Sequence, residues 1–348
     1  METLIFKSDI IEITTDRNIP WFKLCDSTIL VTGATGLVGG VLIRVLAAAD
    51  VEHNLNIRII GHGRNKDLGA ILSQELGIEF IYGDIRDLIS ISAVSGNLDY
   101  IFHCASITKS SEMVSNPVDV ITTAVDGTRN ILELVRKRDC KGFIYLSSME
   151  VYGKIDGIVH EGDLGYLDLS NPRSCYPESK RFCEMMCISY AKQYNIPVKI
   201  ARLAQTFGAG TPKDDTRVFA QFARSAIAGD DIELHTEGKS RGNYCYSADT
   251  LRALLTILLK GSNGEVYNIA NPNTSVTIRE MAELVANDLY DGKVKVVIKV
   301  PDDIKQRGYA EDSGFILNVD KLNALGWKPQ YGLDEMYKRM IADWQDVN

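Results

Sequence analysis

The chain has 348 residues, 45% of them apolar and 24% charged, and 38 basic against 46 acidic side chains give it a formal net charge of −8. This composition is typical of a globular protein and excludes a disordered or collagen-like chain. The acidic excess leaves no broad basic surface for nucleic-acid phosphates, and no apolar run reaches the roughly 20 residues of a membrane-spanning helix. We therefore expect a cytoplasmic protein with neither nucleic acid nor membrane as a partner.

Cysteine and histidine usage argues against a disulfide framework and against a metal site. The seven cysteines are odd in number and scattered, without a Cys-x-x-Cys pair, and the five histidines are equally dispersed. Cys183 and Cys187 lie one helical turn apart, but no histidine or acidic cluster completes a metal site around them. We interpret both as small core residues.

Residues 1–26 form an N-terminal extension that carries several charges without a clear period, and its role is not indicated by the sequence. From Ser27, short β-branched runs alternate with amphipathic stretches, which predicts an α/β fold: a doubly wound parallel sheet covered by helices on both faces. The predicted strands are Thr28–Thr32, Ile57–Ile60, Phe80–Tyr82, Tyr100–His103, Gly142–Leu146 and Val198–Leu203, and the predicted helices are Leu37–Ala49, Lys66–Leu76, Val118–Arg138 and Tyr176–Tyr194.

After Ala204 the alternation loosens, which predicts a smaller second lobe. We divide the chain into a doubly wound domain at 27–204, to which 243–270 returns near Tyr244, and a lobe built from 205–242 and 271–348. The further predicted elements are helices at Val218–Ala228, Asp249–Lys260, Thr277–Leu289 and Leu333–Trp344 and a strand at Glu265–Ala270.

A glycine-rich turn follows the first predicted strand and opens the first helix. Gly33, Gly36 and Gly39 permit a tight turn, close approach of the backbone to a pyrophosphate, and close packing of the helix on the strand. The helix N-terminus then offers N–H groups to the anion. We predict a dinucleotide site here, to which Thr35, Leu37 and Val38 also contribute.

The residues after the second and third strands bear on the cofactor. An acidic residue after the second strand would bind the ribose 2′-hydroxyl of NAD, but this chain has Arg64, which can pair with the 2′-phosphate of NADP, and we expect no carboxylate nearby. The alternative is that Arg64 is a solvated charge and that Asn65 and the main chain hold the ribose. Farther on, Asp84 can accept from the adenine amino group while Ile85 packs on the ring.

Two further segments bring catalytic groups together. Tyr176 and Lys180 are four residues apart and so share one face of a helix. A tyrosine with a pKa of about 10 is a poor base at neutral pH, and the ammonium of Lys180 would stabilise the phenolate. Ser148, at the end of a buried strand, can hydrogen-bond the same substrate oxygen and shuttle the proton.

In this order and spacing, the motifs resemble those of the extended short-chain dehydrogenases/reductases that act as NAD(P)-dependent nucleotide-sugar epimerases and dehydratases. The resemblance covers the chain from about Ser27 to the C-terminus. It implies that the first domain is an NAD(P)-binding Rossmann domain, that the second lobe binds a nucleotide-diphosphate sugar, and that Cys104, Ala105 and Ser106 contact the cofactor. The matching segments are 32–39, 83–87, 102–105, 147–148 with 151–153, Tyr176 with Lys180, and 325–329.

The resemblance also implies a reaction: Tyr176 takes the proton of the sugar 4-hydroxyl as C4 is oxidised. Epimerisation, dehydration, decarboxylation or simple keto-sugar reduction can follow. Glu150 stands where dehydratases and decarboxylases also have glutamate, and it is either a base near C5 or only a partner for a substrate hydroxyl. Met149 stands where dehydratases have a proton donor, and neighbouring segments are most similar to the UDP-glucuronate decarboxylase branch.

Three positions depart from the pattern of the family. Gln205 and Ala124 each replace a usual asparagine, the first at a substrate-binding position, and Arg241 lies one residue farther from Asp249 than the common spacing. Arg241 is still the candidate for the diphosphate, because a planar guanidinium suits paired phosphate oxygens, and its alternative is a surface arginine. Arg217 is a weaker candidate for nucleotide contact.

The helices at Val118–Arg138 and Tyr176–Tyr194 resemble a pair that forms a four-helix interface, which implies a homodimer. Two competing interpretations of the function remain at this point. One is an NADPH-dependent reductase of a 4-keto sugar or another carbonyl, which Arg64 favours. The other is a non-catalytic nucleotide sensor, against which the intact set of Ser148, Tyr176 and Lys180 argues.

Overall fold

The computed structural model describes residues 3–87, 93–300 and 314–346. Its centre is a seven-stranded parallel sheet in the order β11-β7-β5-β4-β1-β2-β3. The chain runs outwards from β1 in one direction and then in the other, as a doubly wound sheet requires. The strands are β1 (Thr28–Thr32), β2 (Arg58–Gly63), β3 (Glu79–Tyr82), β4 (Tyr100–His103), β5 (Gly142–Ser148), β7 (Val198–Leu203) and β11 (Val266–Ile269).

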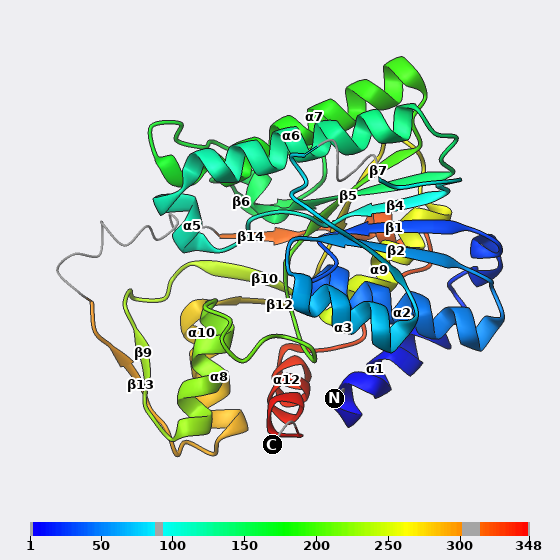
Figure 1. The fold of residues 1–348 in the computed structure, drawn as a ribbon. Coiled ribbons are helices and arrows are strands. Elements are labelled where there is room, and N and C mark those ends of the chain that lie inside the picture. The colour runs from blue at the N-terminus through cyan, green and yellow to red at the C-terminus, as the bar shows by residue number, and fades with distance from the viewer. Residues whose placement is uncertain (1–2, 88–92, 301–313, 347–348) are drawn as a thin grey trace.

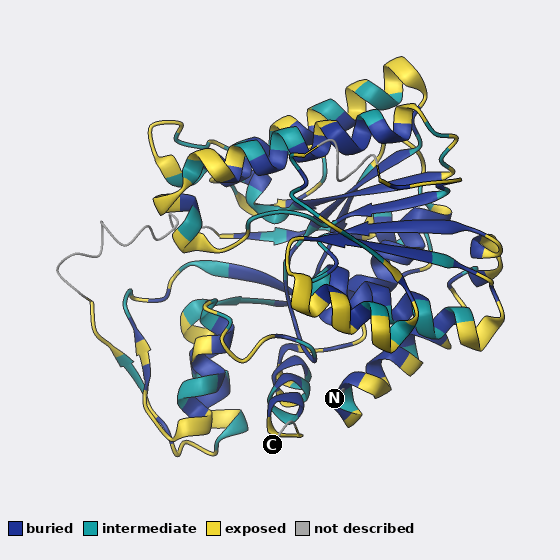
Figure 2. Ribbon diagram, in the orientation of Figure 1, coloured by how far each residue is buried: buried dark blue, intermediate teal, exposed yellow. Residues whose placement is uncertain are grey.

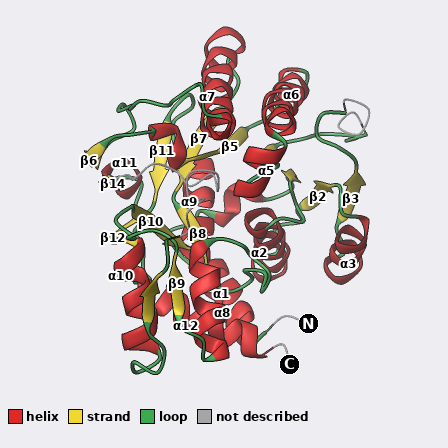
Figure 3. Cartoon of the chain, turned by 90° about the vertical axis from the view of Figure 1, so that its left-hand side faces the viewer, coloured by secondary structure: helices red, strands yellow, loops and turns green. Residues whose placement is uncertain are grey.

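Helices cover both faces of this sheet (Figures 1 and 3). One face carries α6 (Pro117–Arg136) and α7 (Cys175–Tyr194), which pack side by side, and the other carries α2 (Leu37–His53), α3 (Lys66–Leu76) and α9 (Ser247–Lys260). The sheet and the inner sides of these helices are buried, as Figure 2 shows. The predicted fold class is therefore confirmed, and the predicted elements of the first domain agree with the structure to within a few residues.

Outside the main sheet, the described residues form three small sheets and the helices α8 (Val218–Ala228), α10 (Ile278–Glu283) and α12 (Leu333–Asp346). One sheet has the order β12-β10-β8, and the pairs β13-β9 and β14-β6 form the others. Their strands are β6 (Asp156–Val159), β8 (Gln205–Phe207), β9 (Ile232–Leu234), β10 (Arg241–Tyr246), β12 (Asn271–Thr277), β13 (Val296–Ile298) and β14 (Gly314–Leu317). The short helices are η1 (Trp21–Leu24), α5 (Ser110–Ser115), η2 (Met149–Tyr152), η3 (Pro172–Ser174), a π-helical turn (Leu284–Leu289) and α11 (Asp320–Asn323).

The sequence predicts that the chain returns to the first domain near Tyr244, but in the structure this return begins later. Tyr244 lies in β10, which pairs with β8 and β12 and not with the seven-stranded sheet. The return is made by α9, which packs on β5 and β7, and by β11, which adds the edge strand beside β7. A strand prediction from local pattern alone does not indicate which of two sheets the strand joins.

The N-terminal segment is part of the folded core. The helix α1 (Leu4–Thr14) buries Phe6, Ile10 and Ile13, and η1 buries Trp21 and Leu24 in the same hydrophobic cluster as β1 and α2. α1 also contacts α9 and α12, so it joins the two ends of the chain. Within the three described ranges, no helix has both the length and the apolar run needed to cross a bilayer.

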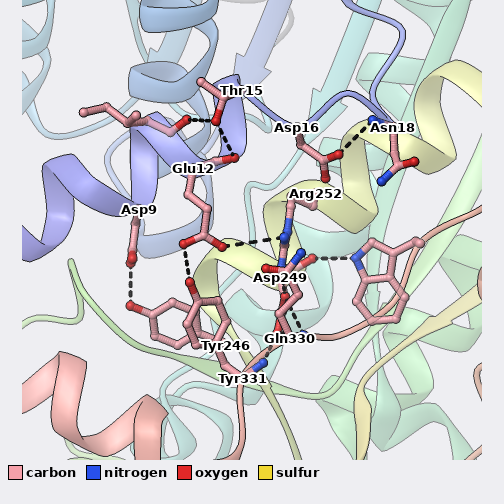
Figure 4. Close-up of polar contacts among 12 residues, drawn as sticks. Asp9, Glu12, Thr15, Asp16, Asn18, Tyr246, Asp249, Arg252, Gln330 and Tyr331 are labelled. Atoms are coloured by element: carbon pink, nitrogen blue, oxygen red, sulfur yellow. Dashed lines mark hydrogen bonds and ion pairs between the residues drawn. The ribbon is translucent and has the colours of Figure 1, made fainter.

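Polar contacts fasten α1 to β10, α9 and α12, and we call this group the N-terminal clasp (Figure 4). Asp9 accepts a hydrogen bond from the Tyr246 hydroxyl and pairs with Arg339. Glu12 accepts from the Tyr331 hydroxyl and lies 3.7 Å from Nη1 of Arg252. The clasp is thus defined by Asp9, Glu12, Tyr246, Arg252, Tyr331 and Arg339.

Candidate active site

Two glycines of the turn after β1, Gly33 and Gly39, lie where the structure has no room for a side chain. A Cβ on Gly33, whose φ is +66°, would lie 2.7 Å from the backbone nitrogen of Ala105, and one on Gly39 would lie 2.4 Å from the carbonyl oxygen of Gly33. The loop that contains Cys104, Ala105 and Ser106 therefore packs directly against Gly33. The glycines set both the turn and the close packing of α2.

The N-terminus of α2 supplies the donors that a pyrophosphate needs. Gly36 is the N-cap residue and provides no capping side chain, so the N–H groups of the first turn are not satisfied by one. Their partial positive charge favours an anion at this position. The residues present therefore fit a dinucleotide, and the contribution of Thr35, Leu37 and Val38 to its binding stays a prediction.

The end of β2 corrects one expectation from the sequence. A carboxylate does lie near Arg64: Oδ2 of Asp84 is 4.0 Å from Nη1 of Arg64. Asp84 is held mainly by Arg86, whose Nε and Nη2 donate to its two oxygens at 3.0 and 2.9 Å, and this pairing keeps the pKa of Asp84 below its usual value. β2 and β3 are neighbours in the sheet, so residues beyond their carboxyl ends meet.

The other residues that the sequence predicts to lie near the adenosine have structural roles of their own. The side chain of Asn65 caps α3 by accepting from the backbone nitrogen of Leu68 at 3.0 Å. Ile85 is buried, and a Cβ on Gly127 would lie 2.8 Å from its Cγ2, so Ile85 packs closely on α6. Arg64 itself keeps a side chain that is 67% exposed, and it can therefore turn towards a ligand.

Tyr176 and Lys180 lie in the first turns of α7, and both are buried. Nζ of Lys180 donates to the carbonyl oxygen of Leu146 at 2.7 Å and lies 5.9 Å from the centre of the Tyr176 ring. Burial raises the pKa of Tyr176 above its usual value and lowers that of Lys180. The predicted pair is present on one helix face, with the ammonium directed at the end of β5.

The end of β5 supplies Ser148 and leads into η2. The Ser148 hydroxyl accepts from the backbone nitrogen of Glu150 at 3.2 Å. Ser148 lies near enough to Tyr176 to lower the pKa of the phenol and partly offset the effect of burial. Ser148, Tyr176 and Lys180 thus lie together, as the sequence predicts.

A buried ion pair holds α7 against the sheet. Glu184, one turn beyond Lys180, accepts from Nε and Nη2 of Arg202 at 2.9 and 2.6 Å and from the hydroxyl of Ser147 at 2.5 Å. These contacts join α7 to β7 and to the residue before Ser148. The sequence analysis missed them because the partners are far apart along the chain.

Arg173 is a site residue that the sequence analysis missed. It lies in η3, three residues before Tyr176, and Nη1 and Nη2 donate to the two carboxylate oxygens of Glu150 at 2.7 and 3.2 Å. Its side chain is only 13% exposed. A basic residue three positions before Tyr176 was the available signal.

A pocket opens between the two lobes at this point, and Met149, Glu150, Arg173, Gln205 and Arg241 lie on its wall. Oε1 of Gln205 is buried, and it has no hydrogen-bond partner among the described residues. An unpaired acceptor at a pocket wall is suited to a ligand hydroxyl. The remaining lining residues are Gly153, Lys154, Tyr166, Leu167, Asp168, Asn171, Ser174, Pro177, Ser240, Gly242, Ile278 and Phe315.

Arg241, the candidate for the diphosphate, and Arg217, the weaker candidate for nucleotide contact, differ in placement. Arg241 lies on the pocket, where it donates to the carbonyl oxygen of Ser275 at 2.5 Å, and the pairing of β10 with β12 shifts register between Gly242 and Tyr244. This bulge can absorb the extra residue before Asp249. Arg217 does not line the pocket: its guanidinium is held by Asp215, with Nη2 2.6 Å from Oδ2.

Comparison with known sequences gives a consistent result. Residues 29–270 match the NAD dependent epimerase/dehydratase family. The chain is 30% identical to UDP-glucuronic acid decarboxylase 6 of Arabidopsis thaliana over 94% of its length and 92% of that protein. It is 24% identical to the low-salt glycan biosynthesis protein Agl12 of Haloferax volcanii over 88% of the chain and 95% of that protein.

Solved structures share the fold. A UDP-glucose 4-epimerase from Thermotoga maritima, crystallised with UDP-glucose, aligns with a TM-score of 0.78 at 23% identity over 92% of this chain and 99% of the other. A dTDP-glucose 4,6-dehydratase from Streptomyces venezuelae with NAD bound aligns with a TM-score of 0.77 at 22% identity over 92% and 97%. At these identities the likeness concerns the fold.

Proposed function

Because the chain belongs to the NAD dependent epimerase/dehydratase family, whose members are NAD(P)-dependent enzymes acting on nucleotide sugars, we propose that it decarboxylates a nucleotide-diphosphate hexuronic acid through a 4-keto intermediate. The observation that carries this choice is the pair of side chains beside the pocket, Met149 and Glu150. The 30% identity to a UDP-glucuronic acid decarboxylase supports it.

Oxidation of the sugar at C4 uses three side chains, Ser148, Tyr176 and Lys180, together with the cofactor. A dinucleotide held at the turn of Gly33, Gly36 and Gly39 would supply a reversible hydride acceptor for C4 of the sugar. Tyr176, as phenolate, takes the proton of the 4-hydroxyl, and Ser148 donates a hydrogen bond to the same oxygen. Lys180 places a positive charge beneath the phenol and favours its ionised form.

The step after C4 oxidation distinguishes the reactions of this family. In a 4-keto hexuronate, the C5–C6 bond breaks without an acid catalyst: C6 leaves as CO2, and the electron pair of the bond forms an enolate across C4 and C5. The enolate then takes a proton at C5 that comes from solvent, and we assign the carboxylate of Glu150 to holding the water that relays it. Dehydration instead requires a proton donor for the departing hydroxyl, and Met149 has none.

The test is to incubate the purified protein with UDP-, dTDP-, GDP- and CDP-sugars, UDP-glucuronic acid included, and to follow the products by NMR and mass spectrometry. We expect a uronic acid to lose the mass of CO2. Loss of water from a neutral sugar, or an epimer of unchanged mass, would replace decarboxylation by one of the other reactions. A carbonyl reduced with net consumption of NADPH would support the reductase instead.

For the cofactor, we propose that the chain accepts NADP through Arg64. Its guanidinium is largely exposed beyond β2, where Gly63 leaves no carboxylate to bind a 2′-hydroxyl. The negative charge of Asp84 does not prevent this binding, because Arg86 donates to both of its carboxylate oxygens and compensates the charge.

Calorimetric titration of cofactor-free protein tests this assignment. We expect Arg64→Leu to weaken NADP binding about tenfold or more and to leave NAD binding nearly unchanged, because only the 2′-phosphate loses a charged partner. Lys66→Leu, which removes another exposed charge nearby, is the matched control. Equal NADP affinities for wild type and Arg64→Leu would contradict the proposal.

We also propose a homodimer through α6 and α7. Their outer surfaces expose large apolar side chains, namely Val118, Ile121, Phe182, Met185 and Ile188. A contiguous apolar surface on a soluble protein is typical of an interface. Analytical ultracentrifugation at micromolar concentration should give a dimer for wild type and a monomer for Phe182→Glu, and a monomeric wild type would refute the assignment.

A further inference from the structure

The contact between Arg173 and Glu150 is a two-pronged ion pair at the edge of the catalytic site. The planar guanidinium faces the carboxylate with one donor for each oxygen, at 2.7 and 3.2 Å. This arrangement fixes the direction of the carboxylate as well as its charge. Arg173 is the more buried partner, with 13% of its side chain exposed against 32% for Glu150.

The same two residues act in opposite directions on Tyr176. The carboxylate of Glu150 raises the pKa of the phenol, and the guanidinium of Arg173 lowers it. Arg217 also lowers it, but its own charge is already opposed by Asp215. The groups that face or adjoin the phenol come from five segments: Ser148 of β5, Glu150 of η2, Arg173 of η3, Lys180 of α7, and Arg217 before α8.

We propose that Arg173 is a positioning residue that aims the carboxylate of Glu150 at the sugar and shields Tyr176 from its negative charge. The proposal rests on the proposed function, since it assigns Arg173 to the C4 oxidation that Tyr176 performs. Without Arg173, Glu150 is a freely rotating anion beside the group that must become a phenolate. With Arg173, the site keeps a carboxylate for C5 without losing the base for C4.

The kinetic test follows the C4 oxidation step by rapid mixing, through the near-ultraviolet absorbance of the reduced cofactor, as a function of pH. We expect Arg173→Gln to move the acidic limb of this profile up by about one pH unit, because unpaired Glu150 opposes ionisation of Tyr176. Arg173→Lys keeps the charge, so its limb should stay near that of wild type. In Arg173→Gln with Glu150→Gln, the limb should return to wild type, which a merely structural role would not produce.

A matched control is Arg58→Gln. Arg58 forms the same two-pronged pair with Glu79, at 2.6 and 2.7 Å, at the edge of the main sheet away from the pocket. We expect its pH profile to coincide with that of wild type. An Arg173→Gln profile that also coincides with wild type would overturn the proposal.

Crystal structures of the variants separate this proposal from the proposed function. We expect the carboxylate of Glu150 to leave its present position in Arg173→Gln, and to stay nearby but lose its fixed direction in Arg173→Lys, whichever sugar the enzyme uses. If no sugar is oxidised, the proposed function fails, but these structures still decide the positioning. An unmoved Glu150 in Arg173→Gln would overturn it.

Discussion

The start of α7 and the N-terminal clasp both bury ionisable side chains, but they use them in opposite ways. At α7, Tyr176 and Lys180 are buried beside a pocket whose wall includes Glu150 and Gln205. In the clasp, Asp9 contacts Tyr246 of β10, as Figure 4 shows, and Arg339 of α12, so these side chains are closed on one another. Burial shifts the pKa values of both groups.

The difference teaches that burial alone does not identify a catalytic group. A group with a shifted pKa that lies beside a pocket can be reached by a ligand. In a closed network of side chains, the same pKa shift changes only the pH dependence of folding stability. Removal of the Tyr176 hydroxyl should therefore change turnover and leave stability nearly constant. Substitutions in or beneath the clasp should do the reverse.

Tyr176→Phe should have the largest effect on turnover. Removing the hydroxyl removes the base for the sugar 4-hydroxyl, and we expect turnover of the accepted nucleotide sugar to fall by about 10²–10⁴-fold. Thermal unfolding should change little, because the ring remains in place. Tyr190→Phe, farther along α7, removes a hydroxyl that donates to Glu133 at 2.7 Å and should retain activity. Turnover of Tyr176→Phe within about tenfold of wild type would contradict the assignment.

This comparison also explains what the sequence could predict. The β1 turn, Ser148, Tyr176 and Lys180 are recognisable because each acts through a local pattern of glycines or a helical spacing. The elements of the main sheet were predicted well because apolar strand segments alternate there with amphipathic helical stretches along the chain.

The clasp, the small sheets and Arg173 were not predictable in this way. Asp9 and Arg339 are 330 positions apart, and strands of three or four residues such as β9 show no period. The prediction that no carboxylate lies near Arg64 was wrong for a related reason. Asp84 is distant from Arg64 along the chain, but β2 and β3 are adjacent in the sheet and bring the two side chains together.

Two isoleucines on α1 test whether the region beneath the clasp contributes to stability. Ile13 is fully buried and Ile11 is 61% exposed, on the same helix. Ile13→Ala should lower the free energy of unfolding by about 2–5 kcal/mol, because it leaves a cavity beneath the clasp. Ile11→Ala is the control and should change it by less than about 0.5 kcal/mol. Urea unfolding measures both, and equal effects would show that α1 is not packed as described.

The ionisation of Asp9 gives a more specific effect, in the lower part of the range expected for Ile13→Ala. Burial, with a contribution from Glu12, raises the pKa of Asp9 from 3.8 to about 6 although Tyr246 and Arg339 oppose the shift. The folded state therefore binds this proton more tightly than the unfolded state does. The stability that Asp9 contributes is greatest below about pH 4, falls as the pH rises to about 6, and is constant above that.

Asp9→Asn removes this dependence, and its side-chain oxygen can still accept from Tyr246 or Arg339. We expect the unfolding free energy of wild type relative to Asp9→Asn to fall by roughly 3 kcal/mol between pH 4 and pH 7, at about 1.4 kcal/mol for each unit of pKa shift. Glu52→Gln, at an exposed position on α2, removes the same charge from a solvated side chain and should run parallel to wild type. Parallel curves for Asp9→Asn and wild type would mean that Asp9 is ionised in the folded protein without cost, and the clasp would then resemble a surface ion pair.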